Sequence, residues 1–535
     1  MRFVEVLLEI KVIWLLIIVT SVAMIVRKIK LPYTVALVVV GLVLGFFDII
    51  SGIHLTPDLL FFLLLPALLF EAAFHLDMDD FLRNAWAIII LAVPGVLLTM
   101  FIVGVIVAFG IEMTGTGMVF TMGTALLFGS LIAATDPISV LAIFKKLGIS
   151  KKFTIIIEGE SLFNDGTAVV IFSIALAALQ GGELTFTDSL FRFLFVVAGG
   201  VAVGAILGFA LSVLTAQVDD HLIEITLTTI LAYGAYLVAE SVHIFDMHFS
   251  GVIAVVVAGM MSGNFGTRYG MSPTTKLAVS SFWEYVVFVV NSMVFILIGI
   301  ELTVAHLVDH IVPILIAWGA VLLSRVVVVY LTRPLVNRLG SDISPRWGWV
   351  LVWGGIRGSI SMVLVLSLPK DFPHRELILS MTFGVVFLTL IGQGMSMRPL
   401  LNWLGIGLVS EEKRTYERMR GGLMAVSRAM EELERMRERR TISQENFEVV
   451  QKDYLERMKV LEEKISDLHL EKELLKYEEA YAARRHLLIV QKDTLKTLVL
   501  QGMVSEEAAG ELTRKLDAEL HLLEEKEEER LQEES

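Results

Sequence analysis

The chain has 535 residues, of which 55% are apolar and only 19% are Asp, Glu, Lys or Arg, whereas soluble domains are roughly 25% charged. Residues 1–410 contain 26 acidic and 21 basic side chains, and residues 411–535 contain 31 and 23. This split excludes a single soluble enzyme domain, and neither part has the clustered basic surface of a nucleic-acid binder. The chain has no cysteine, which excludes a disulfide scaffold, a thiolate metal site and a cysteine nucleophile.

The apolar segments of residues 1–410 predict thirteen membrane-spanning helices, because a bilayer core about 30 Å thick needs roughly 20 apolar residues per helix. The first segment is expected to be a retained helix and not a cleaved signal. Three glycines at four-residue steps, Gly200, Gly204 and Gly208, predict close helix packing. The predicted spans are 12–26, 31–47, 57–74, 84–110, 118–144, 154–180, 188–215, 222–240, 243–261, 277–301, 310–332, 347–368 and 376–397.

Lysine and arginine in the short loops indicate the orientation of these helices. If the N-terminus is outside, the inner loops contain thirteen basic residues, including Lys30 and Arg268, and the outer loops contain four. An odd number of spans then places the charged tail in the cytoplasm. We therefore expect a multi-pass protein of the cell membrane (plasma or inner), with the lipid bilayer as one of its partners.

The fifth span is interrupted deep in the membrane at Thr135-Asp136-Pro137. Proline has no backbone N–H and clashes with the preceding turn, and it disfavours helical dihedral angles at Asp136. We expect the helix to break here and to leave free carbonyls beside a carboxylate. Such backbone survives at membrane depth only when it is buried in protein or lines a wet cavity. An ordinary proline kink with Asp136 as a cap is the alternative.

A polar cluster opens the sixth span. Ser161 and Asp165 are four residues apart and share one helix face, and Glu160 and Asn164 form the neighbouring stripe. Two carboxylates, an amide and a hydroxyl then converge within about two turns, and oxygen ligands of this kind suit a hard cation. A charge at the bilayer centre costs at least ~2.5–3.5 kcal/mol, so Asp165 is a candidate functional residue. Glu158 is expected to be solvated at the interface.

Two other spans contain ionisable residues at membrane depth. In the twelfth span three glycines surround Arg357, whose buried guanidinium needs a carboxylate or backbone carbonyls, and Glu160 is the nearest candidate partner. In the third span Glu71 either lines the approach to the site or reaches the nearby interface. The remaining polar groups are expected to be structural, either as an ion pair between Glu301 and Arg325 or as hydrogen-bonding groups at Glu284, Asn291 and Gln393.

The motifs Ala134-Thr135-Asp136-Pro137 and Glu160-Ser161-Leu162-Phe163-Asn164-Asp165 resemble those of the sodium–proton antiporters of the cation:proton antiporter superfamily. The Asn164-Asp165 pair resembles the electroneutral NhaP-like and eukaryotic-exchanger branch, as do Ser250-Gly251-Val252-Ile253-Ala254 and Gly354-Gly355-Ile356-Arg357-Gly358. The resemblance covers about residues 10–405. It implies an all-α membrane fold with six-helix inverted repeats, two broken helices that cross at mid-membrane (spans five and twelve), and a homodimer.

The resemblance also implies a set of site residues. It implies that Na⁺ is ligated by Asp165, Asp136, Ser161 and the main chain of Thr135, and that Glu71 joins from the third span. It further implies that the site is braced by Asn164, Glu160 and Arg357. The transported species would be Na⁺ and H⁺, one for one, in the service of sodium and pH homeostasis. No resident cofactor is expected, and Li⁺ and K⁺ remain open as alternative cations.

A mechanism follows from the predicted site. A partly desolvated carboxylate beside a second carboxylate is stabilised by either a proton or a cation, and one carboxylate cannot bind both well. An empty, charged site resists crossing the dry barrier, and broken helices in inverted repeats suggest alternating access. The alternative function is a cation channel with a cytoplasmic regulatory domain, although a channel filter needs a symmetric ring of ligands. An enzyme is not expected, because no nucleophile, phosphate loop or metal triad accompanies the carboxylates.

The tail, residues 411–535, has the pattern of charged amphipathic helices and a faint repeat at an offset of 62 residues. Ile442-Ser443-Gln444-Glu445 aligns with Val504-Ser505-Glu506-Glu507, and Leu461-Glu462-Glu463-Lys464 aligns with Leu523-Glu524-Glu525-Lys526. We predict two similar helical units that each open with a serine cap. Shared Glu/Lys composition alone is the alternative explanation. A regulatory or dimer-bracing domain with an unidentified regulator is expected, and a long coiled coil is the rival.

Overall fold

The computed structural model describes most of the chain. The described residues are 2–29, 33–47, 59–114, 120–147, 149, 151–181, 185–218, 220–244, 247–267, 271, 273–301, 304–341, 343–406 and 411–466, with further residues between 480 and 523. Two of the basic loop residues used for the orientation, Lys30 and Arg268, lie outside them. The chain divides into two compact units, Met1–Leu408 and Val409–Ser535.

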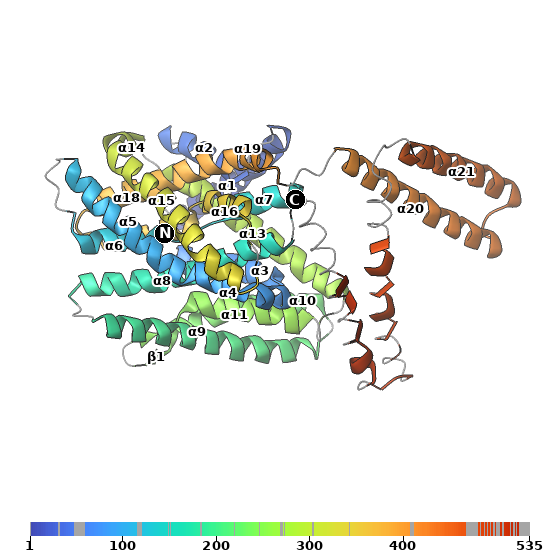
Figure 1. The fold of residues 1–535 in the computed structure, drawn as a ribbon, viewed down its shortest axis with the longest axis horizontal. Coiled ribbons are helices and arrows are strands. Elements are labelled where there is room, and N and C mark those ends of the chain that lie inside the picture. The colour runs from blue at the N-terminus through green and yellow to red at the C-terminus, as the bar shows by residue number, and fades with distance from the viewer. Residues whose placement is uncertain are drawn as a thin grey trace. The chain divides into compact units, whose positions relative to one another are not determined.

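The first unit is built from helices that lie against one another in a bundle (Figure 1). It begins with α1 (Arg2–Ile29), α2 (Tyr33–Phe46), the π-helical turn η1 (Leu59–Leu64), α3 (Leu65–His75), α4 (Met78–Ala92), α5 (Pro94–Met113), α6 (Met122–Leu131), α7 (Ile138–Leu147) and α8 (Lys151–Leu179). It continues with α9 (Phe186–Thr215), α10 (His221–Ser241), β1 (His243–Ile244), β2 (Met247–His248), α11 (Gly251–Met261), η2 (Ser262–Gly266), α13 (Pro273–Glu301) and α14 (Val304–Asp309). It ends with α15 (Ile311–Arg338), α16 (Pro345–Trp353), α17 (Ser359–Leu366), α18 (Arg375–Leu388), η3 (Thr389–Gln393) and α19 (Gly394–Leu404).

Seven helical stretches among the described residues are long and apolar enough to cross a membrane. They are Met78–Met113, Lys152–Leu179, Thr187–Thr215, His221–Ser241, Thr275–Glu301, Ile311–Arg338 and Arg375–Leu404. Shorter apolar helices are Ile13–Val26, Tyr33–Phe46, Phe61–His75, Met122–Leu131 and Gly251–Gly266. The expectation of an all-α membrane domain is therefore confirmed, while the total of thirteen spans stays a prediction.

The predicted start of the ninth span at residue 243 is wrong. The first residues of that segment form β1 and β2, which pair antiparallel, and α11 begins only at Gly251. Ser250 ends the extended segment because its Oγ accepts the N–H of Ile253 at 3.2 Å, as an N-cap does. In Figure 1 the hairpin lies at the end of the bundle where α9 begins.

The glycines of α9 pack as their spacing predicts. An ideal Cβ on Gly204 would lie 2.4 Å from the carbonyl oxygen of Ala254 in α11, so a side chain there would force the two helices apart. An ideal Cβ would lie 2.7 Å from the Ser250 carbonyl oxygen at Gly200 and 2.8 Å from Met261 Cβ at Gly208. Helix α11 also contacts α3 and α8. The glycines therefore set how closely α9 approaches the helix against which α8 packs.

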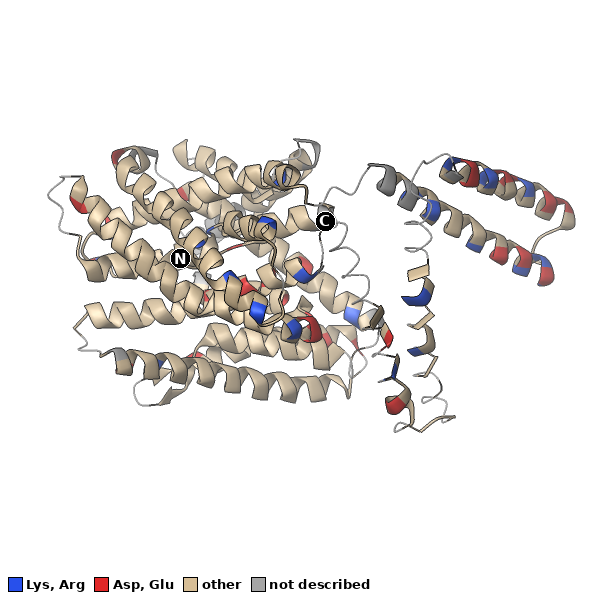
Figure 2. Cartoon of the chain, in the orientation of Figure 1, with Lys and Arg blue, Asp and Glu red and all other residues tan. Residues whose placement is uncertain are grey.

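The second unit contains the antiparallel pair α20 (Glu411–Glu438) and α21 (Gln444–Ser466), whose surfaces are densely charged, in contrast to the first unit (Figure 2). The hydrogen bonds around the helix starts recur at the predicted offset of 62 residues. The N–H groups of Thr441 and Met503 donate to the carbonyls of Met436 and Leu498, and Ser443 and Ser505 accept from Asn446 and Ala508. The aligned residues Glu524, Glu525 and Lys526 lie outside the described residues.

Candidate functional site

The fifth span breaks where its sequence predicts. Helix α6 ends at Leu131, and the backbone stays non-helical up to Pro137. The N–H of Asp136 donates to the carbonyl of Ile356 at 2.7 Å, and its Oδ1 accepts the N–H of Ile138 at 3.1 Å, at the start of α7. Asp136, within the break, is thus held through its backbone N–H on one side and through its carboxylate on the other.

The second break lies between α16 and α17 and contacts the first. An ideal Cβ on Gly358 would lie 2.3 Å from Cβ of Asp136, so only glycine permits this approach. One guanidinium nitrogen of Arg357 donates to the carbonyls of Ala133 and Ala134, which the broken helix leaves without helical partners. Arg357 is 1% exposed. Arg357 belongs to the second break and therefore supplies the hydrogen-bond donor for carbonyl groups that the first break leaves free.

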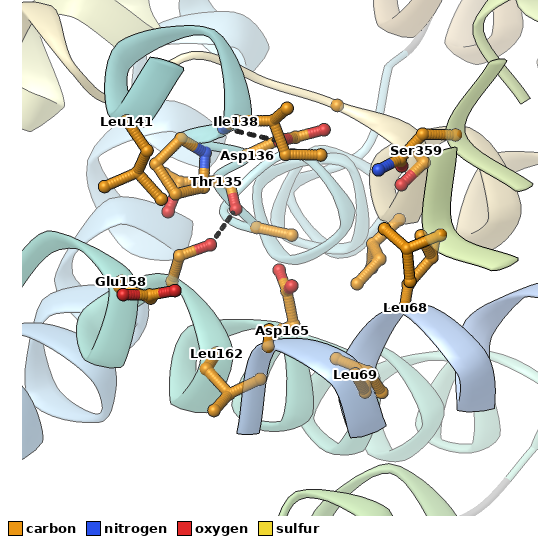
Figure 3. A pocket seen from close by; sticks show the side chains of 18 of the residues that line it. Leu68, Leu69, Thr135, Asp136, Ile138, Leu141, Glu158, Leu162, Asp165 and Ser359 are labelled. Carbon is orange, nitrogen blue, oxygen red and sulfur yellow. Dashed lines mark hydrogen bonds between the residues drawn. The ribbon is translucent and has the colours of Figure 1, made fainter. Parts of the chain in front are cut away.

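Helix α8 presents its polar stripe to the first break. Ser161 Oγ donates to the carbonyl of Thr135 at 2.6 Å, and Asn164 Nδ2 donates to Thr135 Oγ1 at 3.2 Å and to Glu160 Oε1 at 3.3 Å. Asp165 points away from these bonds into the open space between the break and α3 (Figure 3). The structure thus brings Thr135, Asn164, Ser161 and Asp165 together as the sequence predicts.

Asp165 lines a cavity of about 330 Å³. The cavity is also lined by Ser161 and Asp136, by Glu71 from α3, and by Glu158. The residues that α8 contributes extend from Glu158 to Asp165, so the cavity lies toward the Lys151 end of that helix. Glu71 was expected either to line the approach to the site or to reach the interface, and its place in the cavity wall favours the first alternative. Glu71 Oε1 also lies 3.3 Å from His75 Nδ1.

The expected partner of Glu160 is wrong. Arg325 of α15, and not Arg357, forms a bidentate ion pair with Glu160, with both N–O distances 2.8 Å. The proposed pairing of Arg325 with Glu301 is wrong for the same reason. The two side chains of the Glu160 pair are 7% and 2% exposed, so each carboxylate oxygen needs a charged donor. A buried arginine in an apolar run signals such a pair, but not which carboxylate completes it.

Two polar residues at the cavity were missed as site residues. Asn291 of α13, expected to be an interhelical hydrogen-bonding group, lines the cavity, and so does Ser359 at the start of α17. Glu158 also lines the cavity instead of facing only the interface. Among the described residues no cluster of three or more His, Asp or Glu side chains is suited to hold a metal ion. The site is therefore a mixed set of carboxylate, hydroxyl, amide and carbonyl oxygens.

Comparisons with known proteins agree with this geometry. The profile of a protein family described as "Sodium/hydrogen exchanger, transmembrane" matches residues 15–403. The low-affinity Na⁺/H⁺ antiporter NhaS1 of Synechocystis sp. is 38% identical over 484 residues, 89% of each chain. The Na⁺/H⁺ antiporter NhaP of Pseudomonas aeruginosa is 40% identical over 348 residues, 64% of this chain and 80% of the relative. The solved structure of the sodium proton antiporter MjNhaP1 from Methanocaldococcus jannaschii has a similar fold, with a TM-score of 0.63 at 23% identity, over 75% of this chain and all of that one.

Proposed function

The chain belongs to the sodium/hydrogen exchanger family, and we propose that it exchanges Na⁺ for H⁺ across a membrane with Asp165 as the shared binding group. The observation that supports this most is the position of Asp165, which reaches a cavity from a helix held against two broken helices. A carboxylate at membrane depth is costly unless a proton or a cation neutralises it. The two relatives described above are both named as Na⁺/H⁺ antiporters, which supports sodium as the cation.

The cation is bound, in this proposal, by Asp165, Asp136, the Ser161 hydroxyl and the Thr135 carbonyl. All four residues line one cavity, and Na⁺ prefers oxygen ligands of this kind. In the structure the Ser161 hydroxyl donates to the Thr135 carbonyl, and a bound cation would replace that hydrogen bond with two ligand contacts. Glu71 joins from α3 on the open side.

The exchange is electroneutral in this proposal, with one Na⁺ for one H⁺. Asn164 cannot titrate, and Glu160 is neutralised by Arg325, so among the residues of the two motifs Asp165 and Asp136 are the carboxylates left to share the exchanged charge. Gly166, next to Asp165, packs against Ile253 of α11, where an ideal Cβ would lie 2.4 Å from Ile253 Cδ1. This tight contact beside Asp165 supports alternating access over an open channel pore.

The Asp165→Asn variant tests the proposal. In vesicles that contain the purified protein and a pH-sensitive dye, a Na⁺ gradient should move protons through the native chain and not through this variant, because an amide does not exchange a proton. Asp188→Asn, at the first turn of α9, is the matched control and should retain full exchange. Retained exchange in Asp165→Asn would contradict the role of that residue. A membrane potential that develops with the flux would favour the channel.

The remaining expectations are also proposals. We propose a homodimer in the cell membrane, with residues 411–535 as a regulatory or dimer-bracing domain on the cytoplasmic side. The helical pair α20–α21 supports a folded tail. Two helices bury little surface alone and gain stability by packing on a partner, which supports the dimer-bracing role. Isotope flux with Na⁺, Li⁺ and K⁺ in turn would rank the cations.

A further inference from the structure

Among the described residues of α13, Asn291 is the polar side chain in the wall of the cavity at Asp165. The other α13 residue in that wall is Val287, one helical turn earlier, so the two share a face of the helix. Helix α13 also contacts α3 and α17, which contribute Glu71 and Ser359 to the same wall. The cation ligands proposed above leave the Asn291 amide without a role.

The face of α13 that Asn291 occupies is fixed by contacts of its neighbours. Ser292, the next residue, faces α2, where the Tyr33 hydroxyl lies 2.8 Å from Ser292 Oγ. Trp283, about two turns earlier, is 1% exposed and donates its indole N–H to Thr228 Oγ1 of α10 at 3.1 Å. A rotation of α13 about its axis would break both contacts. Asn291 is therefore held at the cavity and cannot turn away with its helix.

Helices α2 and α13 also pack too closely to slide past each other. An ideal Cβ on Gly41 would lie 2.2 Å from the carbonyl oxygen of Ile296, and one on Gly299 would lie 2.3 Å from the carbonyl oxygen of Val38. Small residues of this kind let two helix backbones meet. Asn291 is thus carried by a tightly packed helix pair, which gives it the fixed geometry that a ligand residue needs.

Two buried oxygen acceptors at this cavity have no hydrogen-bond donor among the described residues. They are Asn291 Oδ1 and Asp136 Oδ2. Buried acceptors almost always have a partner, because an unpaired one forfeits the hydrogen bonds that it made to water. Both residues line the space into which Asp165 points (Figure 3). The terminal torsion of an asparagine is soft, so a small rotation presents its oxygen to an occupant of that space.

A cation is the occupant that this chemistry fits. Amide oxygens are ligands of hard cations, and they carry no charge and take up no proton in the pH range of exchange. Asn291 would therefore stabilise a bound cation without stabilising a proton on Asp165. The carboxylates, in contrast, bind either species, so they do not by themselves favour Na⁺ over H⁺.

From these observations we propose that Asn291 is a further ligand residue of the transported cation, and that it shifts the competition at Asp165 toward Na⁺. The inference rests on the proposed function, in which Asp165 binds Na⁺ and H⁺ in turn. Because the amide does not titrate, it raises the affinity for Na⁺ by the same factor at every pH. It leaves the affinity for H⁺ unchanged.

Kinetics of the Asn291→Leu variant test this role, because leucine keeps the approximate shape of the side chain and removes its oxygen. In vesicles that contain a pH-sensitive dye, the KM for Na⁺ should rise roughly three- to tenfold, by the same factor at about pH 7 and about pH 9. The rate at saturating Na⁺ should stay within twofold of the native rate.

The matched control is Asn84→Leu. Asn84 is 8% exposed in α4, and its Nδ2 donates to the Asp80 carbonyl of the same helix at 3.0 Å, away from the cavity wall. Its KM should equal that of the native chain. The proposal is overturned if Asn291→Leu has a KM within twofold of the native value, or if the factor differs between the two pH values. A loss of the saturated rate without a rise in KM overturns it too.

Asn291→Asp is the second variant, and it keeps both the shape and the oxygen of the side chain. Its added carboxylate should lower the KM for Na⁺ at about pH 9 and make the KM rise more steeply on acidification. A KM equal to the native value at that alkaline pH overturns the proposal, even if Asn291→Leu does not fold. Exchange retained in Asp165→Asn would instead overturn the proposed function, so the two failures are distinguishable.

Discussion

The ion pair between Glu160 and Arg325 should contribute more to stability than any pair on the tail helices. Both side chains are nearly inaccessible and meet through two parallel 2.8 Å contacts. Removal of one partner leaves the other charge buried without compensation, which costs about 3–5 kcal/mol. Arg325→Met should therefore lower the free energy of unfolding by that amount, while a double replacement of both residues by methionine should lower it far less.

The assay is denaturant unfolding of the purified protein in detergent, followed by tryptophan fluorescence. The matched control is Glu431→Gln, which removes one partner of the exposed pair Arg428–Glu431, whose side chains are 74% and 53% exposed. Exposed pairs contribute about 0–1 kcal/mol, so this variant should be close to the native chain. The reasoning is refuted if Arg325→Met costs no more than Glu431→Gln, or if the double variant is as unstable as the single one.

Two further predictions concern the crossing of the breaks and the hairpin. Gly358→Ala should abolish exchange, because the added Cβ would overlap the Asp136 side chain. Gly392→Ala, with no atom within 4 Å of the added Cβ, is the control and should be active. Equal activity of the two variants in the vesicle assay would contradict the close approach of Gly358 to Asp136. His248→Gln should lower the thermal stability at about pH 5.5 and not at about pH 9. Because Glu240 raises the pKa of His248 in the folded chain, the stabilisation is complete below the ordinary value of 6.5 and is lost as the pH rises through the raised value; a loss that is the same at both pH values would contradict this.

The sequence by itself determined the features that depend on local backbone chemistry. Pro137 breaks the fifth span because it lacks an N–H, and the glycines around Arg357 break the twelfth. The helical period alone placed Ser161 and Asp165 on one face. Each of these features depends on residues a few positions apart, so no knowledge of packing was needed.

The tertiary structure decided every pairing between distant segments. Glu160 and Arg325 are 165 residues apart, and the sequence offered several arginines and several carboxylates of equal merit. The ninth span was predicted too long because the composition of an apolar stretch beside a membrane helix does not distinguish it from the helix. The pairing of two short strands depends instead on contacts across a turn. The lining of the cavity at Asp165 could be predicted only in part, since Asn291 and Ser359 come from α13 and α17, which meet α8 only after the helices pack.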